Sequence, residues 1–198
     1  MNEQFNYIEE ANVTMSDGFH CEMVSHEFLM MQLNDLIEIV DDLDRIKKAL
    51  FYGRALPEAM AQGDSHLRRN DIQVVGLHDN PHDGIRLLHG IIGIITEAGE
   101  LAYALREGLQ GRKLDITNLG EEVGDIQWYA AAILRVLGTD FDKVQRTNIA
   151  KLRARFPDKF NEHDANNRNL ERERQILEVN ESGRLQYGEP APSTEHGA

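Results

Sequence analysis

Two pairs of acidic residues occur at helical spacing in the middle of the chain, Glu97 with Glu100 and Glu122 with Asp125. The members of each pair are three residues apart, so on a helix they lie on the same face. Carboxylate oxygens are the ligands that Mg²⁺ prefers, and Mg²⁺ usually shares its coordination with substrate phosphates. The four carboxylates therefore predict a metal-dependent enzyme that acts on a phosphate compound.

The acidic pairs border apolar stripes on their helices, which places them at the interior or the mouth of a helical bundle. Gly90 and Gly93 share the stripe of Glu97. These glycines indicate either a ligand that approaches the backbone or a second helix that packs closely. Each acidic pair taken alone is more typical of a solvated acidic face, because two acids at this spacing are very common on helices. The matching register of the two pairs favours the metal site, because four converging carboxylates repel one another without a cation.

A second group of candidate residues lies on the helix expected after Asp140. Asn148, Lys151 and Arg155 fall within about one quarter of its circumference. Lys and Arg neutralise phosphate oxygens, and Arg does so with two hydrogen bonds. The alternative is a solvated basic face. Glu121 lies beside the second acidic pair. The sequence favours none of its three possible roles, which are a further metal ligand, a residue that supports a ligand and an exposed residue without a role in the site.

The hydrophobic periodicity predicts an all-α fold with an antiparallel, four-helix-bundle-like core. The short connection between the two acidic helices makes them antiparallel neighbours, so the acidic pairs face each other. Residues 1–20 and most of 57–84 are expected to be irregular. The helices are expected at 22–52, 85–108, 116–137, 140–156 and 167–181. The expected organisation is an N-terminal helix and loop that complete the bundle (1–84), a catalytic helical core (85–181) and a disordered tail (182–198).

Composition excludes several classes of protein. The formal net charge of −13 over 198 residues argues against a nucleic-acid partner, which would need a basic face, and against docking on anionic lipid. The single Cys21 excludes an internal disulfide and suits a reducing compartment. The N-terminus lacks the features of a signal peptide, and no apolar run reaches the length of a membrane span. We therefore expect a soluble, intracellular protein of the cytoplasm.

The sequence around these residues resembles the all-α nucleoside triphosphate pyrophosphohydrolases, the MazG-like group. The resemblance covers about residues 85–175, and the segment at 47–57, KKALFYGRALP, is similar to phage-type members. The matching segments are GIITEAGEL at 93–101, NLGEEVGDIQWY at 118–129 and NIAKLRARFPDKF at 148–160.

The resemblance implies Mg²⁺-dependent cleavage between the α and β phosphorus of a nucleoside triphosphate, giving a monophosphate and pyrophosphate. It implies two or more Mg²⁺ ions, with Glu97, Glu100, Glu122 and Asp125 as catalytic metal ligands. Asn148, Lys151 and Arg155 would bind the substrate. It also implies a homo-oligomer, a dimer or tetramer, with sites at or near subunit contacts. The resemblance to the phage-type MazZ branch, which acts on dGTP and dATP, favours these two compounds as substrates.

Two alternatives stay open. A phosphoribosyl-ATP-type pyrophosphohydrolase would share the carboxylates and differ in the base pocket. A non-catalytic helical dimer would act as an interaction module through residues 22–52. The sequence also leaves open which carboxylate is the general base, and whether residues 53–84 form a lid, an arm or a disordered segment.

Overall fold

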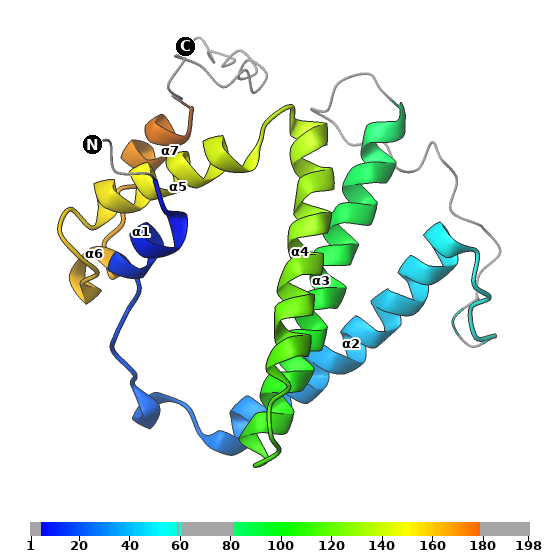
Figure 1. The fold of residues 1–198 in the computed structure, drawn as a ribbon. Coiled ribbons are helices and arrows are strands. Elements are labelled where there is room, and N and C mark those ends of the chain that lie inside the picture. Colours follow the sequence, from blue (N-terminus) through cyan, green and yellow to red (C-terminus); the bar gives the residue numbers. More distant parts are fainter. Residues whose placement is uncertain (1–4, 59, 61–80, 179–198) are drawn as a thin grey trace, which may run out of the picture. The chain divides into compact units, whose positions relative to one another are not determined.

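The computed structural model describes residues 5–58, 60 and 81–178, and within these residues it contains helices and no strand (Figure 1). The predicted all-α class is therefore confirmed. The chain divides into two compact units, one of residues 20–139 and one of residues 1–19 with 140–198, which are described in turn. The helices are α1 (Tyr7–Val13), α2 (His26–Tyr52), α3 (Pro81–Leu109), α4 (Ile116–Leu137), α5 (Phe141–Arg155), α6 (Glu162–Asn166) and α7 (Leu170–Glu178), with a 3-10 turn at Cys21–Met23.

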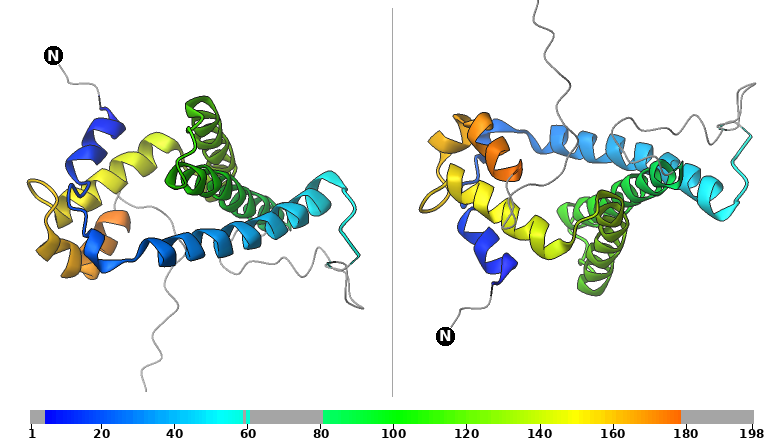
Figure 2. Two further views of the ribbon diagram at one scale, coloured as in Figure 1. Left: turned by 90° about the horizontal axis from the view of Figure 1, so that it is seen from below. Right: turned by 90° about the horizontal axis from the view of Figure 1, so that it is seen from above.

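The unit of residues 20–139 is built from α2, α3 and α4. Helices α3 and α4 lie side by side (Figure 1), and α2 packs on α3 (Figure 2). Ile37 and Val40 of α2 and Tyr129 and Val136 of α4 are its most buried apolar side chains. The packed core of this unit thus consists of three helices, and a fourth helix for a bundle does not come from its described residues.

Glycines on α3 allow the neighbouring helices to approach closely. A β-carbon on Gly93 would lie 2.2 Å from Tyr129 Cδ1, and one on Gly99 would lie 2.2 Å from Val40 Cγ1. A β-carbon on Gly90 would lie 2.7 Å from Ile133 Cγ1. The stripe of small residues therefore serves helix packing, and the interpretation of Gly90 and Gly93 as clearance for a ligand is not needed.

Local chemistry explains most helix ends of this unit. Ser25 caps α2 by accepting a hydrogen bond from the backbone N–H of Phe28 at 3.1 Å. Asp115 caps α4, as the sequence predicts, by accepting from Thr117 and Asn118. Gly53 and Gly138 end α2 and α4 with φ of 67° and 66°, a conformation that glycine adopts without steric cost.

Several predicted boundaries were wrong. Helix α2 begins at His26 rather than residue 22, because Ser25 supplies the cap. Helix α3 begins at Pro81 rather than residue 85, since proline is tolerated in the first helical turn, where its missing N–H has no partner to lose. The short helix α1, capped by Asn6, lies where an irregular segment was expected. The rest of the predicted 57–84 connection, at 59 and 61–80, and the predicted tail at 182–198 lie outside the described residues.

The other unit contains α1, α5, α6 and α7. Helix α5 packs against α7 and α1, and its buried residues include Ile149. Phe156 follows α5, is 3 % exposed and packs on Phe160 with ring centroids 5.2 Å apart. The polar helix predicted near 167–181 corresponds to α7, and the short helix α6, which was not predicted, precedes it. Asn161 caps α6 by accepting from the backbone N–H of Asp164 at 2.8 Å.

Exposed apolar side chains are frequent on the three-helix unit. Ile39 of α2 is 61 % exposed and Trp128 of α4 is 61 % exposed. Leu29, Leu36 and Leu50 of α2 are each at least 40 % exposed. Surface this apolar is typical of a protein that associates with another molecule. None of the helices in the described ranges is both long and apolar enough to cross a membrane.

Candidate metal centre

Three of the four predicted carboxylates converge between α3 and α4. One oxygen atom from each of Glu97, Glu122 and Asp125 lies within 4.8 Å of the others. Glu97 comes from α3 and the other two from α4, so the antiparallel packing of these helices creates the cluster. Because Mg²⁺ holds its oxygen ligands at about 2.1 Å, modest side-chain rotation is enough for these three groups to share one cation. The hard, anionic oxygen donors fit this ion.

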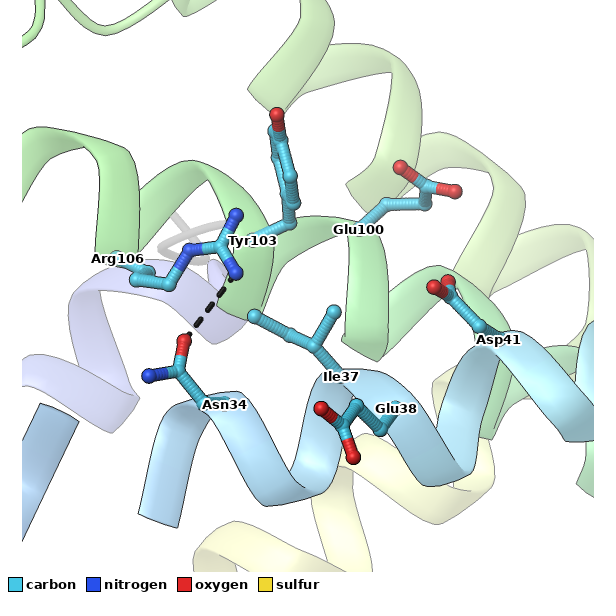
Figure 3. Close-up of a pocket in the computed structure, with 7 residues that line it drawn as sticks. All are labelled: Asn34, Ile37, Glu38, Asp41, Glu100, Tyr103 and Arg106. Carbon is cyan, nitrogen blue, oxygen red and sulfur yellow. Dashed lines mark hydrogen bonds between the residues drawn. The ribbon is translucent and has the colours of Figure 1, made fainter. Parts of the chain in front are cut away.

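The fourth carboxylate, Glu100, lines a neighbouring pocket between α2 and α3 (Figure 3). Asp41 lies near Glu100 in this pocket, and Arg106 donates a hydrogen bond to Asn34 at 3.2 Å. Glu100 is not among the three residues whose oxygens meet within 4.8 Å. It therefore borders the cluster and extends its acidic surface toward α2. The pocket is lined by Asn34, Ile37, Glu38, Asp41, Glu100, Tyr103 and Arg106.

Glu122 lies at the electrostatic centre of the cluster. Burial raises the pKa of its carboxyl group, and the negative charges of Glu100, Glu97 and Asp125 raise it further. Asn118, one turn earlier on α4, donates a hydrogen bond to Glu122 Oε1 at 3.1 Å. A divalent cation would reverse the repulsion that these charges impose. The site is thus arranged so that a bound metal ion relieves an unfavourable accumulation of charge.

Glu97 has a partner that the sequence reasoning missed. The ammonium of Lys47 on α2 donates to Glu97 Oε1 at 2.9 Å and to Thr96 Oγ1 at 2.7 Å. Burial lowers the pKa of Lys47, but its hydrogen bond to Glu97 and the charge of Glu97 outweigh this effect, so the pKa is raised. The signal was present in the sequence, since Lys47 interrupts the core-facing side of α2 one turn after Leu43.

Aromatic side chains surround one side of this centre. Phe51 stacks on His89 with ring centroids 3.9 Å apart, and Trp128 packs edge-on against Tyr129 at 4.9 Å. The hydroxyl groups of Tyr129 and Tyr52 lie 3.4 Å apart. Burial, followed by this hydrogen bond, raises the pKa of Tyr129 to about 12. Tyr129 is buried, whereas Trp128 presents most of its indole to solvent one turn after Asp125.

The predicted substrate-binding residues share α5, in the other unit. Asn148 donates a hydrogen bond to the hydroxyl of Tyr7 at 2.8 Å. Arg155 forms two hydrogen bonds with Glu173, from Nε at 2.8 Å and from Nη2 at 2.6 Å. Lys151 is half-buried on the same helix. These contacts fix Asn148 and Arg155 within their own unit.

Glu173 is the most strongly perturbed carboxylate of this unit. It is 4 % exposed and accepts hydrogen bonds from Arg155 and from Arg168. These two hydrogen bonds, that from Arg155 first, lower its pKa to about 2. Two guanidinium groups on one buried carboxylate make a stable ion pair that orients Arg155. Glu173 could not be predicted from the sequence, because nothing in the periodicity of α7 separates it from the exposed Glu171.

Comparison with known proteins identifies the central segment. Residues 89–160 match the family described as the MazG nucleotide pyrophosphohydrolase domain. Searches of curated proteins and of solved structures gave no match. The matched segment contains all of the predicted site residues on α3, α4 and α5. Members of this domain family are nucleoside triphosphate pyrophosphohydrolases, so the chain is a hydrolase of this class.

Proposed function

We propose that the protein cleaves the bond between the α and β phosphorus of a nucleoside triphosphate, with Mg²⁺ held by Glu97, Glu100, Glu122 and Asp125. The observation that carries this proposal is the convergence of Glu97 with Glu122 and Asp125 across the packed helices α3 and α4. The domain match supports the same reaction class. Glu100, at the border of the cluster, supplies a ligand for a second ion.

The residues of the site have distinct roles in this reaction. When bound, Mg²⁺ would supply electrophilic activation of the phosphoryl group and of the attacking water. A carboxylate of the cluster that is not engaged by metal accepts the proton of that water. The triphosphate is bound by three residues of α5, Asn148, Lys151 and Arg155. The positive charges of Lys151 and Arg155 offset negative charge on the departing pyrophosphate. Glu173 holds the guanidinium of Arg155 in place.

The proposed substrate is a purine deoxynucleoside triphosphate, dGTP or dATP. This preference rests on the resemblance to the phage-type branch of the family. The exposed indole of Trp128 lies one turn from Asp125 and offers a flat apolar surface on which a base can stack. A larger purine gains more from such stacking than a pyrimidine does.

We further propose that the active protein is a homo-oligomer, a dimer or tetramer. Leu29, Leu36, Leu43 and Leu50 recur every seven residues on α2, with Ile39 and Ile46 between them. This spacing is the pattern of a seam between two packed helices. Most of these side chains are at least 40 % exposed in the single chain. A second copy that covers the seam would complete the three-helix core.

The test is a panel of all common ribo- and deoxynucleoside triphosphates and phosphoribosyl-ATP, with pyrophosphate release measured in Mg²⁺ and in EDTA. Metal-dependent release from dGTP and dATP alone supports the full proposal. Release confined to phosphoribosyl-ATP supports the related pyrophosphohydrolase. Release from no compound, together with no stabilisation by Mg²⁺, supports the non-catalytic helical dimer, because a ligand that binds the native state must stabilise it.

A further inference from the structure

Lys47 is the most deeply buried basic side chain near the carboxylate cluster, with only 4 % of its surface exposed. Its ammonium lies 2.7 Å from Thr96 Oγ1, 2.9 Å from Glu97 Oε1 and 3.3 Å from Asp44 Oδ1. A lysine has three donor protons, so these three acceptors account for its hydrogen-bonding capacity. A buried lysine is rare unless it is paired, and an apolar side chain would fill the same space at a smaller desolvation cost.

The contacts of Lys47 fix the orientation of Glu97. The hydroxyl of Thr96 lies 2.8 Å from the backbone carbonyl of Gly93, to which it donates, so it accepts from Lys47. Both the ammonium and this hydroxyl lie within 3.2 Å of the same carboxylate oxygen, Glu97 Oε1. A carboxylate keeps a second oxygen and further lone pairs for a cation. Glu97 is therefore held in one orientation while it retains the capacity to bind metal.

Lys47 is itself held from three helices. Asp44 contacts it from one turn earlier on α2, and Thr96 and Glu97 contact it from α3. The ring of Tyr129 on α4 lies with its centroid 5.3 Å from the ammonium, within the range of a cation–π interaction. The ammonium thus has little freedom to move, which is the condition for a group that orients another.

We propose that Lys47 is a positioning residue that holds Glu97 ready to bind a divalent cation together with Glu122 and Asp125. This inference rests on the proposed metal site. Two effects of Lys47 on metal affinity oppose each other, since its charge repels a cation while its hydrogen bond orders a ligand. The charge is already balanced by the contacts with Glu97 and Asp44, so the ordering effect dominates. Loss of the ammonium frees Glu97 to turn away from the cluster.

The test is calorimetric titration of the full-length protein with Mn²⁺ in the absence of nucleotide, for wild type and for Lys47→Met. Residues that orient metal ligands typically contribute about 10–100-fold to metal affinity, and a loss in that range is expected for Lys47→Met. Lys47→Arg, which can still donate to the carboxylate, recovers part of the loss. Arg45→Met is the matched control, because Arg45 is an exposed basic residue of the same helix that pairs with Asp42 instead, and the Mn²⁺ affinity of this variant stays near that of wild type.

A double-mutant cycle with Glu97→Gln separates positioning of Glu97 from a purely structural role of Lys47. The quantity measured is whether the effects of the two substitutions on Mn²⁺ affinity add. If Lys47 acts through Glu97, Lys47→Met has no further effect on Mn²⁺ affinity once Glu97 is replaced. Lys47→Met leaves the Glu97 carboxylate without its partner, whereas the double variant does not, so the double variant should be at least as stable as Lys47→Met. The inference is overturned if folded Lys47→Met binds Mn²⁺ as tightly as wild type, or if the two effects add. Absence of Mn²⁺ binding by wild type overturns the proposed metal site and the inference together.

Discussion

The ring of Tyr129 on α4 lies directly against Gly93 on α3, where a β-carbon would be 2.2 Å from Tyr129 Cδ1. Glu97 follows Gly93 by four residues, and Asp125 precedes Tyr129 by four residues. Because α3 and α4 are antiparallel, the close contact at Gly93 sets the distance at which the two carboxylates meet one turn away. The packing of α3 against α4 at Gly93 therefore helps to position the carboxylates of Glu97 and Asp125 in the candidate metal centre.

Replacement of Gly93 by alanine is expected to lower the free energy of unfolding by about 1–3 kcal/mol, because the added methyl group forces the ring of Tyr129 to move. Urea denaturation monitored by circular dichroism measures the change. Gly120→Ala on α4 is the control, since no atom lies within 4 Å of a β-carbon there, and the better helix propensity of alanine should leave that variant unchanged or slightly more stable. Equal stability of Gly93→Ala and wild type would contradict the packing role of Gly93.

Replacement of Glu122 by glutamine is expected to abolish activity and to stabilise the metal-free protein. The variant loses a metal ligand, but it also loses a buried charge that Glu100 and Glu97 repel. Thermal unfolding with and without Mg²⁺ separates the two effects: Mg²⁺ should raise the Tm of wild type and not that of Glu122→Gln. Asp35→Asn, at an exposed position of α2, is the control and should respond to Mg²⁺ as wild type does. Retained activity of Glu122→Gln would remove this residue from the site.

The ion pair of Glu173 should make stability depend on acid pH. The folded pKa of Glu173 is lowered from 4.5 to about 2, so its contribution is present above 4.5 and is lost as the pH falls toward 2. Replacement by glutamine is expected to cost about 1.5–3 kcal/mol at neutral pH, the range for hydrogen bonds to charged groups. The difference from wild type should shrink as the pH falls below 4.5. Glu171→Gln, at an exposed position of the same helix, should show little difference at any pH.

A charge placed in the seam of α2, the row of leucine and isoleucine side chains that a second copy is proposed to cover, is expected to dissociate the oligomer. Ile39→Glu changes a side chain that is 61 % exposed in the single chain, so it should leave the fold of the protomer intact. Analytical ultracentrifugation should show a dimer or tetramer for wild type and a monomer for Ile39→Glu. Arg45→Ala, on the polar side of α2, should keep the wild-type mass. A monomeric wild type would contradict the proposal that a second copy covers the seam.

The sequence was sufficient to predict the all-α class, the caps at Asp115 and Asp140 and the helix ends at Gly53 and Gly138. These features depend on interactions within a few residues, which a sequence pattern records directly. The three-residue spacing also predicted that acidic side chains would meet between two helices.

What the sequence did not predict depends on contacts between distant residues. Lys47 and Glu97 are 50 positions apart, and Arg155 and Glu173 are 18 apart, so neither pairing has a periodic signal. The spacing of Glu97 and Glu100 places both on one face, yet Glu100 borders the pocket toward α2 while Glu97 joins the cluster toward α4. Three-residue spacing rotates the second side chain by about 60°, enough to give the two carboxylates different neighbours.

The most direct test of the central claim is the identity of the products from dGTP in the presence of Mg²⁺, resolved by ³¹P nuclear magnetic resonance. Cleavage between the α and β phosphorus predicts dGMP and pyrophosphate in equal amounts, and no product in EDTA. Formation of dGDP and inorganic phosphate would contradict the proposed site of cleavage. Product formation that persists in EDTA would contradict the role assigned to Glu97, Glu122 and Asp125.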